Sequence, residues 1–314
     1  MVRVKPFAAI RPAKGLVTEI AAPPYDVLNS EEAAAMAGEK SLLHITKPEI
    51  DFTPMAGEHE QRTYDKAVEN FKLWQQRGWL CRDPKPCYYV YSQTMGKRTQ
   101  YGLVLCAHTD DYASGTIKKH ELTRKDKEDD RMVHVRIQNA NIEPVFLAYR
   151  DDAVLDGMIS KYSKNNPEYD FTADEDGTHH TLWVIDDAGD IRRITEAFAG
   201  IPALYVADGH HSLICLEQEL KVLEADPFAV DQIAPEGGVF GIDLVVLESQ
   251  NDAADGKIAK KQEPNGGGYE RSGELQHDLH FVSRTVGLAF FSDGIDDLFH
   301  LFRDLFQRRN VGFR

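Results

Sequence analysis

The chain has 314 residues, of which 42% are hydrophobic and 28% are charged, and its formal net charge is −15. This length suffices for a substantial core and for two domains, and the acidic excess argues against general nucleic-acid binding, which requires a basic surface. The chain shows no apolar run of the about 18 residues that span a bilayer, no leader-like N-terminus and no metal-type spacing of its four cysteines, so we expect a cytoplasmic protein without a membrane partner.

Residues 1–95 are predicted to form an N-terminal α/β unit. Ser30, followed by two glutamates and an alanine run, predicts a helix N-cap, because a hydroxyl can accept from a free backbone N–H. Residues 42–45 predict a short strand. Residues 58–77 predict the clearest helix, with apolar positions at spacings of three and four, and Gly78 is expected to end it.

Four polar residues of this unit are candidates for a substrate pocket. Asp26 follows two prolines, and His44, Lys47 and Glu49 surround a third proline. Asp26 can orient a ligand or make an Asx turn, and His44 can reach a pocket or serve as a hydrogen-bonded structural residue. The sequence leaves both pairs of alternatives open.

A second unit is expected over residues 96–230. Residues 88–93 and 99–109 are rich in aromatic and β-branched side chains and are separated by Met95-Gly96-Lys97, which predicts a β-hairpin across the junction of the two units. Further strands and helices then follow in mixed order, which indicates an α+β or mixed-sheet α/β fold. The predicted strands cover residues 145–149 and 179–185, and the predicted helices cover residues 152–162 and 190–198.

Residues 117–136 form a run that is dense in both signs of charge. His120 and Glu121 put an imidazole beside a carboxylate, which suits proton abstraction. Arg124 and Arg131 can bind phosphate oxygens in a bidentate manner. The carboxylates that could hold a hard cation such as Mg²⁺ are Asp126, Glu128, Asp129 and Asp130. The alternative is a solvated helix face. After this run, Asn139 and Asn141 could hydrogen-bond a ribose or a substrate.

Residues 204–213 predict a strand, an abrupt turn and the start of a helix. Asp208, Gly209, His210 and His211 occupy the turn. Gly209 permits close backbone approach, and the free N–H groups of a helix start favour an anion such as phosphate. The alternative is a helix cap with solvated histidines. His179 and His180 are interpreted as the surface start of a strand with a structural role.

The remaining residues, 231–314, are predicted to form a divergent or truncated C-terminal α/β portion. Residues 213–225 continue the helix, residues 239–247 predict a strand, and residues 249–274 predict a loop. Residues 296–306 predict a short amphipathic helix that packs on the body or forms a homodimer contact.

Five segments in order resemble a widespread prokaryotic domain-of-unknown-function family, number one thousand and fifteen. They are Pro23-Pro24-Tyr25-Asp26-Val27, His44-Ile45-Thr46-Lys47-Pro48-Glu49, His120-Glu121-Leu122-Thr123-Arg124, Lys127-Glu128-Asp129-Asp130-Arg131 and Ala207-Asp208-Gly209-His210-His211. The family is similar to the ParB/sulfiredoxin-like nucleotide-binding superfamily, which includes free serine kinases. The resemblance covers residues 1–212 and implies a ParB/sulfiredoxin-like core.

The resemblance implies a kinase-like activity that uses ATP or ADP and transfers phosphoryl to a hydroxyl, with free serine as the candidate acceptor. It implies Glu121 as the base and the turn at 208–211 as the phosphate site. Ser212 replaces the arginine of the family pattern, which removes a bidentate phosphate ligand. The alternatives are a non-catalytic sensor of nucleotides or amino acids and a ParB-like DNA-associated protein, which the acidic charge disfavours.

Overall fold

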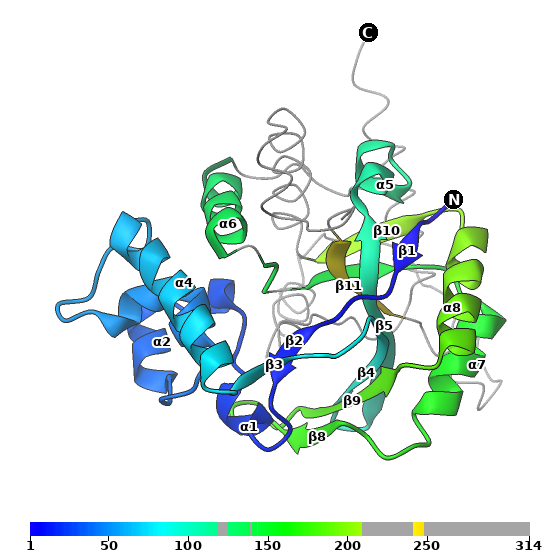
Figure 1. The fold of residues 1–314 in the computed structure, drawn as a ribbon, viewed down its shortest axis with the longest axis horizontal. Helices are drawn as coiled ribbons and strands as arrows, with labels where there is room; N and C mark the ends of the chain where they lie inside the picture. Colours follow the sequence, from blue (N-terminus) through cyan, green and yellow to red (C-terminus); the bar gives the residue numbers. More distant parts are fainter. Residues whose placement is uncertain (119–124, 139, 143, 209–240, 248–314) are drawn as a thin grey trace, which may run out of the picture.

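The chain folds around one mixed β-sheet with helices on both sides (Figure 1), and the computed structural model describes residues 1–118, 125–138, 140–142, 144–208 and 241–247. For residues 125–131, 208 and 241–247 it describes the backbone alone. Helices and strands alternate along the chain without a regular βαβ repeat. The fold is therefore mixed α+β, as the sequence predicts.

Nine of the described strands form the sheet. In spatial order they are β6 (Ile117–Lys118), β10 (Leu204–Asp208), β7 (Val145–Ala148), β11 (Gly241–Leu247), β5 (Arg98–His108), β4 (Tyr88–Met95), β9 (His179–Ile185) and β8 (Tyr169–Thr172), and β1 (Val4–Lys5) pairs with β5 where the pairing with β4 ends. The parallel neighbours are β6 with β10 and β7 with β11. All other neighbours in this sheet are antiparallel.

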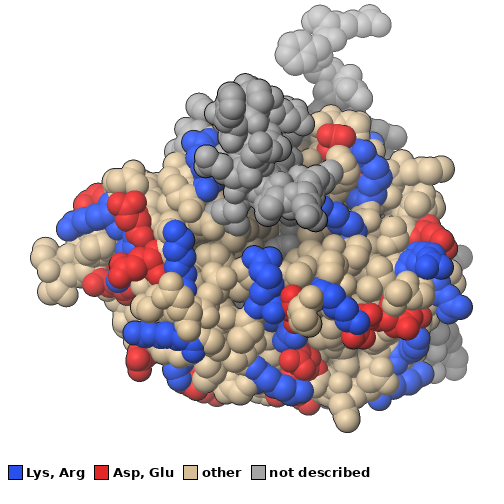
Figure 2. Space-filling model, in the orientation of Figure 1, with Lys and Arg blue, Asp and Glu red and all other residues tan. Residues whose placement is uncertain are grey.

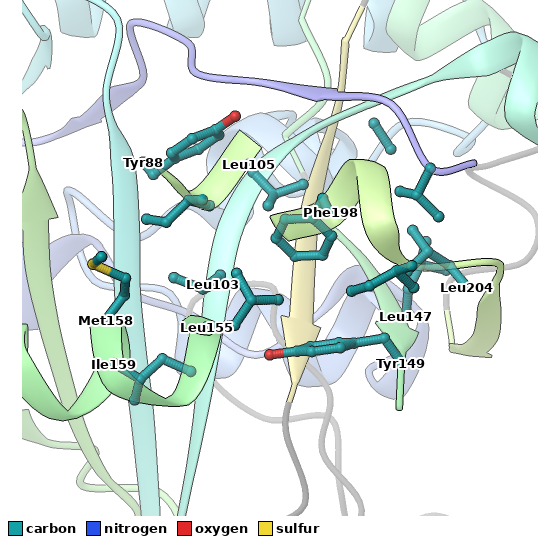
Figure 3. Close-up of a cluster of buried hydrophobic side chains, with 14 of the residues drawn as sticks. Tyr88, Leu103, Leu105, Leu147, Tyr149, Leu155, Met158, Ile159, Phe198 and Leu204 are labelled. Atoms are coloured by element: carbon teal, nitrogen blue, oxygen red, sulfur yellow. The ribbon is translucent and has the colours of Figure 1, made fainter. Parts of the chain in front are cut away.

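The main core lies between the sheet and the helices α7 (Ala153–Tyr162) and α8 (Ala188–Gly200). Figure 3 shows Leu155, Ile159 and Phe198 of these helices directed toward Leu103 and Leu147 of the strands. Burial of each such side chain contributes about 1.5–3 kcal/mol. This two-layer core fixes the strands whose ends carry the candidate site.

The other face of the sheet packs against the N-terminal part of the chain. Alternate residues of a strand point to opposite faces, so Tyr89 and Tyr91 lie away from the main core and form a second cluster with Val104 and Phe146. Phe7 covers this cluster, and the chain then enters a ribbon of β2 (Ile10–Pro12) and β3 (Leu80–Arg82).

The remaining helices are mostly N-terminal. They are α1 (Val17–Ile20), α2 (Ser30–Met36), α3 (Leu43–Thr46), α4 (Gln61–Gln76), α5 (Thr109–Ala113) and α6 (Lys125–Gln138), with 3₁₀ turns η1 (Tyr25–Val27) and η2 (Pro48–Asp51). Figure 1 shows α2, α4 and α6 on the side of the sheet opposite to α7 and α8. None of the helices in the described ranges is long and apolar enough to span a membrane.

Most of the predicted elements are confirmed. Helix α4 lies inside the predicted range 58–77, and the hairpin of β4 and β5 turns at Gly96, whose φ of +59° favours glycine. Strands β7, β9, β10 and β11 and helices α7 and α8 also occupy their predicted ranges. The hairpin lies across the predicted junction at residue 95, so one sheet contains strands from both predicted units.

Three predictions are wrong. Residues 42–45 contribute to helix α3 and not to a strand, since a short apolar run also suits a buried helical turn. The cap of α2 is Asn29, whose side chain accepts from the backbone N–H of Glu32 at 2.9 Å, and not Ser30. His180 is not on the surface, because its exposed fraction is 0%. The predictions for 213–225, 249–274 and 296–306 lie outside the described residues.

Candidate functional site

The two chemically distinctive segments leave the sheet side by side. Strands β6 and β10 are neighbours and run parallel, with Leu204 opposite Ile117 and Tyr205 opposite Lys118. Each strand leads directly into one segment, because His120-Glu121 follows β6 and Gly209-His210-His211 follows β10. Parallel neighbours end at the same edge of a sheet, so the topology places the entry points to both segments at one edge.

The register also fixes how far along the chain each candidate lies from the paired strand ends. Glu121 lies three positions after Lys118, and Asp208 lies three positions after Tyr205, which is the Cα partner of Lys118. Residues 119–124 and 209–212 lie outside the described residues, and these include His120, Glu121, Arg124 and the candidates from Gly209 to Ser212. The structure therefore places the entry points to these segments and not their side chains.

Strand β10 is irregular at its end, just before Gly209. It pairs with β7 on its other side, and the register shifts between Val206 and Asp208, where Asp208 lies opposite Phe146. Such bulges redirect the chain and are common beside functional sites. The backbone of Asp208 thus leaves the regular ladder at the last position before Gly209.

Helix α6 connects the same sheet edge to the N-terminal helices. It follows residues 119–124 and contains Arg131 and the tentative Mg²⁺ ligands Glu128, Asp129 and Asp130, whose side chains lie outside the described part. Near its end, Gln138 Nε2 donates to the carbonyl of Ile45 at 3.3 Å. The buried ring of His134 packs edge-on against Tyr64 of α4, with centroids 5.0 Å apart. The charged segment is therefore attached to the segment that contains His44, Lys47 and Glu49.

Lys47 and Glu49 form a buried ion pair. Lys47 Nζ lies 3.2 Å from Glu49 Oε1 and 3.3 Å from Glu58 Oε1, and the exposed fractions of Lys47 and Glu49 are 6% and 2%. Ser30 Oγ lies 2.7 Å from Glu49 Oε1 and 2.8 Å from Glu58 Oε1. Removing one partner of such a pair costs about 3–5 kcal/mol, because a buried charge is left uncompensated. Here the two predicted pocket residues neutralise each other within the N-terminal helices.

His44 is held by hydrogen bonds at both ring nitrogens. Nδ1 bonds the carboxylate of Asp51, and Nε2 donates to the carbonyl of Gly38 at 3.0 Å. Asn70 of α4 donates to Asp51 Oδ2 at 2.8 Å and to the carbonyl of His44 at 2.7 Å. We call His44, Asp51, Asn70 and Gly38 the His44 clamp.

The His44 clamp favours the charged imidazole. Only the protonated ring can donate from both nitrogens, and the hydrogen bond to Asp51 raises the pKa of His44 against the opposing effect of burial. Burial alone would raise the pKa of Asp51, but the hydrogen bonds from His44 and Asn70 outweigh it and lower that pKa. Both nitrogens of the imidazole are thus engaged in the clamp.

Asp26 lies apart from these contacts. It is exposed in η1, directly after the two prolines. The structure therefore brings three of the four N-terminal candidates, His44, Lys47 and Glu49, into one compact group of helices and leaves Asp26 at its surface.

Sequence reasoning missed the partners of these candidates. These partners lie 7 to 28 residues along the chain from the groups that they contact, and they are Asp51, Glu58, Asn70 and Ser30. No periodicity signals such a polar contact. The one available signal was the density of polar residues around Pro48.

His180 belongs to a different polar cluster, on the sheet. Gln93 Nε2 donates to the Tyr91 hydroxyl at 3.2 Å, and the Tyr91 hydroxyl shares a hydrogen bond with His180 Nδ1 at 2.5 Å. Burial lowers the pKa of His180 to about 4, and the ring stacks on Phe171 at 5.1 Å between centroids. The imidazole is thus neutral at physiological pH and serves the packing of β4, β8 and β9.

The exposed charges are mixed on the face shown in Figure 2, where acidic and basic side chains lie beside each other. A duplex-binding face usually presents a basic stripe. On this face the basic side chains are interspersed with acidic ones, and the net charge of the whole chain is −15.

Comparison with known proteins gives a family and no closer relative. No curated protein and no solved structure matches the chain. A family model described as "Protein of unknown function (DUF1015)" matches residues 4–219, a range that contains all five motif segments. Since the match covers more than half of the sequence, the chain belongs to the DUF1015 family.

Proposed function

We propose that this protein is a small-molecule kinase with a ParB/sulfiredoxin-like core. It binds ATP or ADP and transfers phosphoryl to a hydroxyl, with free serine as the first acceptor to test. One observation carries the proposal: β6 and β10 are parallel neighbours, and each leads into one of the two segments that the chemistry requires. Phosphoryl transfer depends mainly on positioning and charge stabilisation, plus one group that takes the proton of the nucleophile.

Each segment has a role in this proposal. Glu121, beside His120, takes the proton of the acceptor hydroxyl. The backbone and histidines of residues 208–211 hold the phosphates, and Arg124 and Arg131 neutralise the charge that develops on the transferred group. A Mg²⁺ ion, if used, has candidate ligands in Glu128, Asp129 and Asp130 of α6.

The direct test is formation of phosphoserine from serine and either nucleotide. We expect turnover by the purified full chain and a loss of kcat of about a hundredfold or more in Glu121→Gln, because the base is removed at nearly constant shape. The matched control is Glu175→Gln, an exposed glutamate in the β8–β9 turn, which should keep wild-type turnover. Absence of phosphorylated product with the wild-type protein, or full activity in Glu121→Gln, contradicts the proposal.

One residue favours a second candidate, a non-catalytic sensor of nucleotides or amino acids. Ser212 stands where the family pattern has an arginine, and a hydroxyl lacks the charge and the bidentate geometry of a guanidinium. A sensor would bind nucleotide saturably without forming product, and Gly209→Val would abolish that binding by filling the space that a phosphate needs. Product formation by the wild-type protein excludes this candidate.

A further inference from the structure

Asn141 presents a buried hydrogen-bond donor that has no acceptor among the described residues. Its Nδ2 atom is buried and makes no hydrogen bond within the described part of the chain. Buried polar atoms in native proteins nearly always have a partner, so this unpaired amide nitrogen indicates an acceptor that the described part of the chain does not provide.

The position of Asn141 links this donor to the candidate site. It lies between the end of α6 and the start of β7, and Figure 1 shows that connection running between the N-terminal helices and the sheet. The next residue, Ile142, packs against the N-terminal core cluster that contains Ile45 and Trp74. Four residues further on, Phe146 lies opposite Asp208. The connection is therefore held by the N-terminal core on one side and enters the sheet beside the end of β10 on the other.

The hydrogen-bonding chemistry of the Asn141 amide indicates which kind of ligand atom can bind it. An amide nitrogen can only donate, and the acceptors that compensate a buried donor best are anionic oxygens. We propose that Asn141 Nδ2 binds an anionic oxygen of the ligand, either a phosphate oxygen of the nucleotide or the carboxylate of the amino-acid acceptor. Asn141 is thus a positioning residue, and this inference rests on the proposed function.

Two substitutions separate binding from folding. Asn141→Leu removes the donor at similar size, and Asn141→Asp replaces it with a negative charge. The control is Asn166→Asp, which makes the same charge change at an exposed position between α7 and β8. We would measure the Kd of the full chain for ATP, ADP and serine separately by calorimetry, and the melting temperature without ligand.

We expect Asn141→Leu to raise Kd about tenfold and Asn141→Asp to raise it further, because a hydrogen bond to a charged group is lost and then replaced by repulsion. Asn166→Asp should change Kd less than about twofold. Asn141→Leu should melt at or above the wild-type temperature, since an uncompensated donor is removed. Weaker binding of ATP and ADP assigns the contact to phosphate, and weaker binding of serine alone assigns it to the carboxylate.

Wild-type Kd values in both Asn141 variants overturn the inference, and so does a lowered melting temperature in Asn141→Leu, which would indicate an internal partner. These results leave the proposed function intact if the wild-type protein still forms phosphoserine. A wild-type protein that binds neither nucleotide nor serine contradicts the proposed function and this inference together.

Discussion

The residues around Pro48 show that a motif can be recognised in a sequence although the sequence does not reveal the role of its side chains. His44, Lys47 and Glu49 attract attention as polar residues around a proline. In the structure, Lys47 and Glu49 neutralise each other, and both ring nitrogens of His44 are engaged by Asp51 and Gly38. These residues therefore hold the N-terminal helices together, whatever else they contribute to the site.

The His44 clamp predicts a specific dependence of stability on pH. The folded-state pKa of His44 is raised above its unfolded value of about 6.5, so its contribution to stability is fully present below about pH 6.5 and is lost as pH rises through the folded pKa. Urea unfolding of the wild-type protein between about pH 6 and about pH 9 should show this loss as a fall in the free energy of unfolding with rising pH.

His44→Gln should lower the free energy of unfolding at the acidic end of this range and remove most of the pH dependence. His59→Gln, an exposed histidine outside the clamp, should keep the wild-type profile. A profile for His44→Gln that follows the wild type over the whole range would show that the clamp does not titrate.

At the scale of elements, periodic patterns predicted well and short patterns did not. Helix α4 and the hairpin of β4 and β5 follow from repeated apolar spacing and a glycine turn. The segment 42–45 is too short to distinguish the spacing of a helix from that of a strand. It forms part of α3, in which both Leu43 and Ile45 are buried. The parallel pairing of β6 with β10 was not predictable, because β6 has only two residues and its partner lies far along the chain.

The ribbon of β2 and β3 depends on one arginine. Arg11 donates to both carboxylate oxygens of Asp83, from Nε at 3.1 and 2.9 Å and from Nη2 at 2.7 Å. Its Nη1 donates to Glu168, beside β8, at 2.9 Å. Burial opposes the charge, but the hydrogen bond to Asp83 and those to Tyr169 and Glu168 outweigh it and raise the pKa of Arg11. These contacts of Arg11 with Asp83 and Glu168, which we call the Arg11 fork, join the ribbon to the edge strand β8 of the main sheet.

Arg11→Lys should therefore lower the free energy of unfolding by about 2 kcal/mol, because a lysine cannot reproduce the bidentate contact. Arg82→Lys, at an exposed position of the same ribbon, should change it by less than about 0.5 kcal/mol. Both free energies are measured by urea unfolding. Equal decreases in the free energy of unfolding for the two variants would show that the Arg11 fork does not stabilise the ribbon.

At the scale of the whole molecule, the sheet has two structural roles. One face carries the core under α7 and α8, and one edge collects the ends of β6 and β10 together with the connection from α6 to β7. Recognition of the motif segments came from the sequence. The convergence of β6 and β10 on one edge came from strand pairing between residues separated by about ninety positions, which no local pattern encodes.

Hydrogen–deuterium exchange with and without saturating ATP or ADP tests this convergence most directly. If the nucleotide binds where β6 and β10 end, the peptides that contain residues 117–124 and 204–212 should both become protected, while peptides from β8 and β9 should not change. Protection of only one of these two regions, or of neither, under conditions where calorimetry shows saturation, would contradict the account.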